Sequence, residues 1–172
     1  GHRVGLLGAT GGHSTVMTDG FARAGFSVPS LTAASYGKLA GFFNVTGGSY
    51  KNPIDGLGGS PENLPAILDI LDHDANIDAI AVEMLPRMGR SWPDRIEAYV
   101  KALAAHRAKS AKPVIAIICS PFTGDDAQLV IDLDRRLLEV GVPAFPSVDR
   151  GARALKKVSD YHRFRQEIAG GP

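Results

Sequence analysis

The chain has 172 residues, which fits one ordinary domain with its own core and makes a second full domain implausible. Its 19 lysines and arginines balance 18 aspartates and glutamates, and the net charge of +1 comes without a block of either sign, so the composition indicates neither a nucleic-acid nor a membrane-surface partner. A single cysteine excludes an internal disulfide and a cysteine-rich metal site.

The first part of the chain predicts one strand and two helices. Residues 3–8 are an apolar run with the length of a buried strand. Residues 14–24 carry apolar side chains at helical spacing, and Gly25 is placed as their C-cap. Residues 32–43 predict a second helix.

The middle of the chain continues the alternation. After a long loop over residues 44–51, residues 52–56 predict only a short strand, because the proline there cannot donate to a ladder. Ser60, placed as an N-cap before a proline, starts a helix that runs to about residue 73. Residues 77–85 then form a nearly continuous apolar strand.

The second half alternates helix and strand in the same way. The expected elements are a helix from Ser91 past Leu103, a strand over 112–120, a helix from Thr123 to Gly141, a strand over 142–145 and a helix from Ser147 to about Ile168. In the last helix, Tyr161, Phe164 and Ile168 form a stripe that suits either the core or an interdomain docking surface.

Strands that are apolar on both faces and alternate with helices are typical of a parallel sheet covered on both sides. The sequence therefore predicts an α/β protein with a flavodoxin-like, doubly wound three-layer sandwich of about five parallel strands. In such a fold ligands bind beyond the carboxyl ends of the strands, near the switch in strand order.

The turn between the first strand and the first helix is rich in glycine. Unpaired N–H groups at a helix N-terminus favour an anion, most often a phosphate. The turn partly matches a dinucleotide fingerprint, but the acid expected about 20 residues later is missing, which disfavours a Rossmann oxidoreductase, and it lacks the lysine of a P-loop. We therefore predict a phosphate site, with a purely structural tight turn as the alternative. Its residues are Gly11, Gly12, His13, Ser14 and Thr15.

The other polar residues give weaker signals. Glu83, Arg87 and Arg90 flank Pro86, a stretch that we interpret as a solvated loop, with contact of the arginines to an acidic partner domain or a substrate phosphate as the alternative. Cys119 ends an apolar run and is interpreted as a small buried hydrophobe. No histidine pair has metal-ligand spacing with a carboxylate nearby, so the sequence predicts no metal site and assigns no catalytic residue.

Two observations bear on the setting of the chain. No apolar segment approaches the roughly 20 residues that span a bilayer, and the N-terminus has no basic region followed by an apolar one, so we expect a cytoplasmic location. The chain starts at Gly1 without a methionine and ends in Gly170-Gly171-Pro172, so we interpret residues 1–172 as one domain excised from a larger multidomain protein.

Several motifs, in order along nearly the whole chain, give a family resemblance. They are Val4-Gly5-Leu6-Leu7, Gly11-Gly12-His13-Ser14, Gly25-Phe26-Ser27-Val28-Pro29, Asn52-Pro53-Ile54-Asp55, Gly141-Val142-Pro143-Ala144-Phe145-Pro146-Ser147 and Arg153-Ala154-Leu155. This series resembles the NDP-forming acyl-CoA synthetases. More narrowly, it is similar to their flavodoxin-like CoA-ligase domain, which is related to the C-terminal domain of the succinyl-CoA synthetase β subunit.

The resemblance implies an enzyme that joins a carboxylic acid to coenzyme A. ATP is consumed, ADP and phosphate are released, and the reaction passes through an acyl phosphate and a phosphorylated histidine. Two helix N-termini from different domains would clamp that phosphate, and the helix that opens at Gly12-His13-Ser14 would be one of them. His13 stands where the family usually has a smaller residue. Asn52 and Asp55 would lie near the same edge of the sheet, with an Asx-type turn as their alternative role.

The resemblance also implies which parts lie outside this chain. CoA and ATP or ADP with magnesium would be bound mainly by a CoA-binding domain and an ATP-grasp domain, and no segment here matches the family's phosphohistidine loop. The isolated chain is therefore expected to be inactive and to bind none of these cofactors tightly. The alternative is a stand-alone, non-catalytic flavodoxin-like module that binds a nucleotide or CoA.

Overall fold

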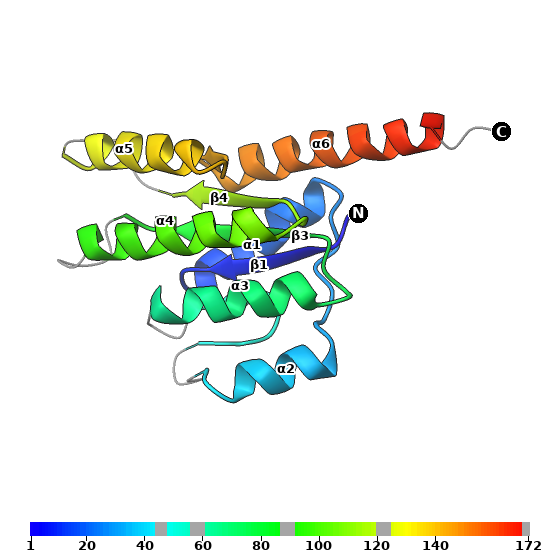
Figure 1. Ribbon diagram of the computed structural model, residues 1–172, viewed down its shortest axis with the longest axis horizontal. Helices are drawn as coiled ribbons and strands as arrows, with labels where there is room; N and C mark the ends of the chain where they lie inside the picture. Colours follow the sequence, from blue (N-terminus) through cyan, green and yellow to red (C-terminus); the bar gives the residue numbers. More distant parts are fainter. Residues whose placement is uncertain (44–47, 56–60, 87–91, 120–124, 170–172) are drawn as a thin grey trace.

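A parallel sheet lies at the centre of the computed structural model, which describes residues 1–43, 48–55, 61–86, 92–119 and 125–169 (Figure 1). Its strands are β1 (Val4–Gly8), β2 (Ile54–Asp55), β3 (Ala79–Met84), β4 (Val114–Ile118) and β5 (Ala144–Phe145). Among the described residues the sheet has 5 strands in the order β2-β1-β3-β4-β5, all paired in parallel. This is the doubly wound order with its switch between β1 and β3, so the predicted flavodoxin-like fold class is confirmed.

Helices connect the strands. They are α1 (Gly11–Arg23), α2 (Ala33–Ala40), α3 (Leu64–His73), preceded by the 3-10 turn η2 (Pro61–Asn63), α4 (Trp92–Lys109), α5 (Asp125–Glu139) and α6 (Val148–Ala169). Gly25 and Gly141 have φ angles of +92° and +76°, so both end their helices in the left-handed conformation. The C-cap of α1 is Ala24, one residue before the predicted Gly25. The predicted cap at Ser147 is confirmed, because its hydroxyl accepts a hydrogen bond from the Arg150 N–H at 3.4 Å.

Some predicted boundaries were wrong. Helix α1 begins at Gly11 rather than Ser14, because the two glycines continue the helix back to Thr10, which is the N-cap. Helix α2 ends at Ala40 rather than residue 43, with Gly41 as its C-cap. The predicted starts at Ser60, Ser91 and Thr123 lie outside the described residues.

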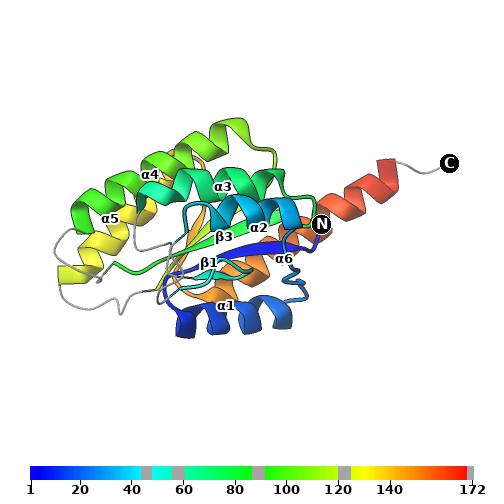
Figure 2. The same ribbon diagram turned by 90° about the horizontal axis from the view of Figure 1, so that it is seen from below.

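The helices form two layers, one on each face of the sheet (Figure 2). α1 and α6 pack together on one face, and α2 to α5 cover the other. Each layer closes a separate apolar core. Met17 and Phe21 of α1, both fully buried, fill the first core, and Leu68 and Leu71 of α3 contribute to the second.

Residues of β3 alternate between these two cores. Ala79 and Ala81 face α1 and α6, whereas Ile80 and Val82 face the opposite helices. Side chains on a strand change face at every residue, so Glu83 belongs on the α1 side. The same alternation in β4 gives Ile115 and Ile117 to the α1 side.

Helix α6 extends past the end of the sheet, away from the body of the molecule (Figures 1 and 2). Tyr161, Phe164 and Ile168 are 57%, 57% and 65% exposed. The suggestion that this stripe belongs to the core is therefore wrong. The start of α6 remains buried, with Val148, Ala152 and Leu155 in the core shared with α1.

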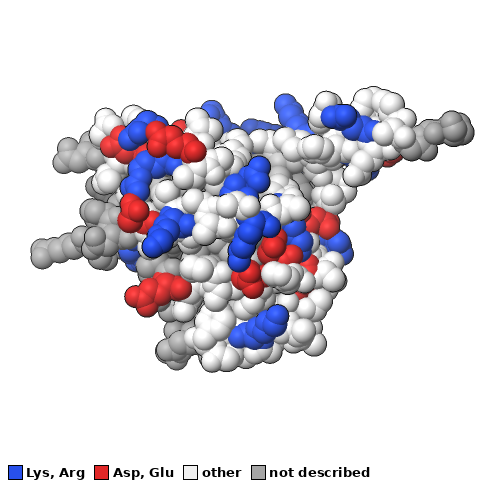
Figure 3. Space-filling view, in the orientation of Figure 1, with Lys and Arg blue, Asp and Glu red and all other residues white. Residues whose placement is uncertain are grey.

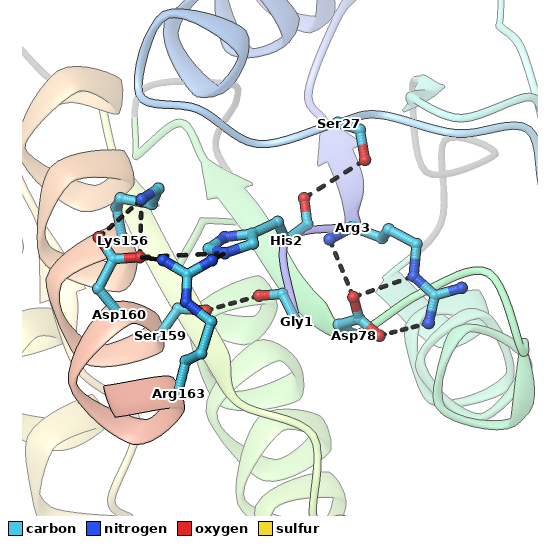
Figure 4. Close-up of polar contacts among 9 residues, drawn as sticks. All are labelled: Gly1, His2, Arg3, Ser27, Asp78, Lys156, Ser159, Asp160 and Arg163. Carbon is cyan, nitrogen blue, oxygen red and sulfur yellow. Dashed lines mark hydrogen bonds and ion pairs between the residues drawn. The ribbon is translucent and has the colours of Figure 1, made fainter. Parts of the chain in front are cut away.

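Polar contacts attach the N-terminal residues to α6 and to Asp78, the residue before β3, at the amino edge of the sheet (Figure 4). Arg3 donates to both carboxylate oxygens of Asp78, at 3.0 and 2.6 Å, and this hydrogen bonding lowers the pKa of Asp78 to about 2. On the other side Arg163 contacts the His2 ring at 2.8 Å, and burial followed by the Arg163 charge lowers the pKa of His2. Ser159 donates to the Gly1 carbonyl.

Charges are mixed on the surface. Basic and acidic side chains are interspersed over the face covered by α2 to α5 (Figure 3), as the balanced composition predicts. Among the described residues no helix is long and apolar enough to cross a membrane.

Candidate functional site

The N-terminus of α1 lies at the carboxyl end of β1, next to the switch in strand order. Thr10 is extended, with φ −149° and ψ 164°, and its side chain does not cap the helix. The Ser14 N–H makes the first helical bond, to the Thr10 carbonyl at 2.8 Å. The N–H groups of Gly11, Gly12 and His13 therefore precede the first intrahelical bond and need acceptors from outside the helix. Both glycines are exposed, so an anion has access to these groups.

Close packing on β1 sets the position of this helix. A Cβ atom on Gly8 would lie 2.1 Å from the Ser14 hydroxyl oxygen and 3.0 Å from the Ser14 Cα, so glycine is required for α1 to sit this close. Ser14 is buried against this strand, and its hydroxyl has no hydrogen-bond partner among the described residues. The Thr15 hydroxyl donates to the Gly11 carbonyl at 3.1 Å. Of the five predicted phosphate residues, Ser14 is buried, His13 is partly exposed, and Gly11, Gly12 and Thr15 are exposed.

A buried carboxylate lies beneath the first turn of α1. Glu83 is 1% exposed, and its two oxygens accept hydrogen bonds from the Ala9 N–H at 3.0 Å and from Nδ1 of His13 at 2.7 Å. The interpretation of this position as part of a solvated loop was wrong. Glu83 belongs to β3, and the strand alternation directs it toward α1. Because the Glu83 carboxylate accepts a hydrogen bond from Nδ1 of His13, this nitrogen carries a proton. Nε2 is the second ring nitrogen and is available to a ligand.

Cys119 completes the group around Glu83. Burial, and then the charge and hydrogen bonding of Glu83, raise the pKa of the Cys119 thiol to about 12. The thiol is therefore protonated at neutral pH, which excludes it as a thiolate nucleophile in this state. Ligand atoms of His13, Glu83 and Cys119 all lie within 4.8 Å of one another.

A second carboxylate flanks the same helix end. A Cβ atom on Gly11 would lie 3.1 Å from Oδ2 of Asp55, so Asp55 is a direct neighbour of the first turn. Burial raises the pKa of Asp55, and its Oδ1 atom is buried without a partner among the described residues.

The structure separates Asn52 from Asp55, which the sequence analysis paired. The Asn52 side-chain oxygen accepts from the Leu6 N–H at 3.0 Å, and its amide group donates to the carbonyls of Val4 and Pro29 at 3.0 and 2.9 Å. These bonds use the polar atoms of Asn52 to hold the chain against the middle of β1, away from the first turn of α1.

Replacing Asp55 with asparagine is expected to stabilise the protein at neutral pH. A carboxyl group whose pKa is raised on folding favours the folded state below its unfolded value of 3.8, and this advantage is lost as the pH rises through the higher folded value. Asparagine does not ionise, so the Asp55→Asn variant does not lose stability in this way as the pH rises. Its melting temperature should exceed that of the wild type by a small margin at pH 7 and match it near pH 3. A lower melting temperature at pH 7 would show that contacts in the folded protein stabilise the ionised carboxylate of Asp55.

Solved structures of two proteins share this fold. A protein of Pyrococcus horikoshii OT3 superposes with a TM-score of 0.74 at 18% identity, over 91% of this chain and 34% of its own. The dinucleotide forming acetyl-coenzyme A synthetase 1 of Ca. Korarchaeum cryptofilum, solved in an apo form and in complex with phosphate and ADP, superposes with a TM-score of 0.74 at 21% identity, over 98% of this chain and 35% of its own.

In sequence comparisons, neither a protein-family model nor a curated protein matches the chain. The chain spans about a third of the length of the structures that it resembles. At these identities the similarity shows the fold.

Proposed function

We propose that this chain is a phosphate-handling domain of an NDP-forming acyl-CoA synthetase. Such an enzyme converts an acid, CoA and ATP into acyl-CoA, ADP and phosphate through a phosphohistidine on another domain. The proposal is supported by the ordered motifs of the sequence and by the similarity in fold to about a third of an acetyl-coenzyme A synthetase that was solved with phosphate and ADP.

The observation that carries the proposal is the open first turn of α1. Its N–H groups at Gly11, Gly12 and His13 are aligned with the positive end of the helix dipole, and Gly12, whose Cβ would meet open space, leaves room for an anion to approach. Amides that are already in place stabilise the charge of a phosphoryl group without reorganising during transfer.

His13 would contribute to the same anion site. Its side chain is 43% exposed, and Glu83 fixes the ring through Nδ1. In the protonated ring the second N–H, at Nε2, is a donor for phosphate. The carboxylates of Glu83 and Asp55 repel a bound phosphate, so the hydrogen bonds from the first-turn amides and from His13 must outweigh this repulsion.

The remaining parts of the reaction would lie on other domains. We propose that CoA, the nucleotide and its magnesium are held mainly by CoA-binding and ATP-grasp domains of the same protein or complex. This division agrees with the roughly one-third coverage of the acetyl-coenzyme A synthetase by this chain. The isolated chain would then bind phosphate without completing the reaction.

The phosphate site is tested by adding a negative charge at Gly12. A Cβ atom at Gly12 meets open space, so Gly12→Asp should fold, and the carboxylate would compete for the amides of the first turn. We expect phosphate binding, followed by titration of inorganic phosphate in ³¹P NMR, to weaken by about 10-fold or more.

Gly37→Asp is the matched control. Gly37 is also an exposed helical glycine whose Cβ would meet open space, but it lies in α2, away from the first turn of α1. Unchanged binding in Gly12→Asp, or an equal loss in Gly37→Asp, would show that phosphate does not bind at α1.

The reaction itself is tested in the protein as it is encoded, together with any partner subunit. A panel of carboxylic acids is supplied with CoA and ATP, and the release of phosphate and the loss of free CoA are followed. Turnover that falls in Gly12→Asp but not in Gly37→Asp supports the synthetase. Absence of turnover with every acid would favour the non-catalytic binding module.

A further inference from the structure

Three metal-ligating side chains from distant parts of the sequence meet beside the first turn of α1. His13 comes from α1, Glu83 from β3, and Cys119 directly follows β4. Each offers one ligand atom, and these atoms lie within 4.8 Å of one another. His13 and Glu83 are 70 residues apart in the chain, so local spacing in the sequence does not reveal the group.

The register between β3 and β4 brings these side chains together. Glu83 pairs with Ile117 in the ladder between β3 and β4, and both residues point to the α1 side. Cys119 lies two residues after Ile117, so it returns to the same face at the level of the carboxyl ends. Helix α1 covers that face and brings His13 onto Glu83.

Backbone hydrogen bonds hold Glu83 and Cys119 in place. The Ala9 N–H fixes one oxygen of Glu83, and the backbone N–H of Cys119 donates to the Met84 carbonyl at 3.1 Å. Glu83 is fully buried, Cys119 is half-buried and His13 is partly exposed. The group is therefore closed to solvent at Glu83 and open to solvent at His13. Such preorganisation reduces the rearrangement that a bound ion would require.

We propose that His13, Glu83 and Cys119 bind Zn²⁺, with the fourth coordination position open on the solvent side of His13. Thiolate, imidazole and carboxylate together suit zinc rather than magnesium or calcium, which prefer oxygen ligands. In a tetrahedral zinc site, bond lengths of about 2.0–2.3 Å place ligand atoms roughly 3.3–3.6 Å apart. The 2.7 Å contact between Nδ1 of His13 and Glu83 must therefore open by roughly 0.6–0.9 Å.

Charge balance supports a cation at this place. Zn²⁺ with the Glu83 carboxylate, the Cys119 thiolate and a neutral His13 forms a group of zero net charge, so the positive helix end opposes it little. Binding releases the thiol proton to solvent and moves the ring proton of neutral His13 from Nδ1 to Nε2. The new bonds run from zinc to Nδ1 of His13, to an oxygen of Glu83 and to the sulfur of Cys119. The proposal departs from the sequence-based expectation of no metal. It does not depend on the proposed function, because binding is measured without acid, CoA or nucleotide.

The test uses Co²⁺ as a spectroscopic probe and Zn²⁺ as the competitor, with the purified, reduced chain. We expect one Co²⁺ per chain, with a thiolate-to-cobalt charge-transfer band that one equivalent of Zn²⁺ abolishes and millimolar Mg²⁺ leaves unchanged. Cys119→Ser should remove the charge-transfer band. His13→Ala, which alters a partly exposed side chain and should fold, is expected to weaken zinc binding by about 100-fold or more.

His73→Ala is the matched control, because His73 is a helical histidine beside a carboxylate, Asp69, elsewhere on the surface. Its zinc affinity should equal that of the wild type. A wild-type chain without the charge-transfer band, a Cys119→Ser chain that retains it, or equal losses in His13→Ala and His73→Ala would each overturn the proposal. None of these results bears on phosphate binding, which the Gly12→Asp experiment measures separately.

Discussion

Asp74→Ala is expected to lower the free energy of unfolding by about 3 kcal/mol. Asp74 is 1% exposed, and its carboxylate joins the start of α2 to the turn that follows α3. Its carboxylate accepts from the Thr32 N–H and hydroxyl at 2.8 and 2.9 Å and from the Asn76 N–H at 2.8 Å. Alanine would leave these part-buried donors without their acceptor.

The pH dependence of the unfolding free energy tests the role of Asp74 independently. Burial acts to raise the pKa of Asp74, but hydrogen bonds, led by those from Ser35 and Thr32, outweigh it and leave the pKa below its usual 3.8. A lowered folded pKa stabilises the protein above pH 3.8, and this contribution is lost as the pH falls through the folded value. Asp74→Ala should therefore flatten the acid limb of the stability profile.

Asp74→Asn is the control for charge. It keeps one acceptor oxygen and should lose about 1 kcal/mol, less than alanine. Urea denaturation at several pH values measures both variants. A loss below about 1 kcal/mol in Asp74→Ala would contradict the role assigned to this carboxylate.

Phe21→Ala is expected to cost about 4 kcal/mol of unfolding free energy. Phe21 lies on α1 and is fully buried against the sheet. Its ring packs edge to face on Phe26 at a centroid distance of 5.7 Å. The cavity left by alanine would weaken the attachment of α1, the helix whose first turn forms the candidate site.

Val16→Ala is the control on the same helix. Val16 is 57% exposed, so its truncation should change the unfolding free energy by less than about 0.5 kcal/mol. Urea denaturation with intrinsic fluorescence or circular dichroism checks the pair. Similar losses in both variants would mean that Phe21 does not anchor α1 as its burial indicates.

Much of the fold could be predicted because local signals specify it. Gly25 and Gly141 mark helix ends that need a positive φ, and the apolar runs of β3 and β4 indicate strands buried on both faces. The start of α1 was misplaced because the local signal at Gly11 and Gly12 is ambiguous: glycine is a weak helix former, yet both residues continue the helix here.

The candidate site was predicted only in part. The glycine-rich turn was visible in the sequence, but the group around Glu83 depends on the register between β3 and β4, which is a tertiary property. One signal was available: a carboxylate inside the apolar run that forms β3 must find partners if the strand is covered on both sides. Counting alternate residues from Ala79 also places Glu83 on the α1 side, a step that would have connected it to His13.

The placement of His13, Glu83 and Cys119 on separate elements also links ligand occupancy to the folding equilibrium. No stretch of chain holds the three together until β1, β3 and β4 have paired and α1 has docked, so the unfolded chain lacks the assembled group. A ligand of all three side chains would bind the native state selectively, and at 100 times its dissociation constant it would add about 2.7 kcal/mol to stability by mass action. The melting temperature of this chain should then rise with the free concentration of that ligand, and thermal denaturation alone would report its affinity.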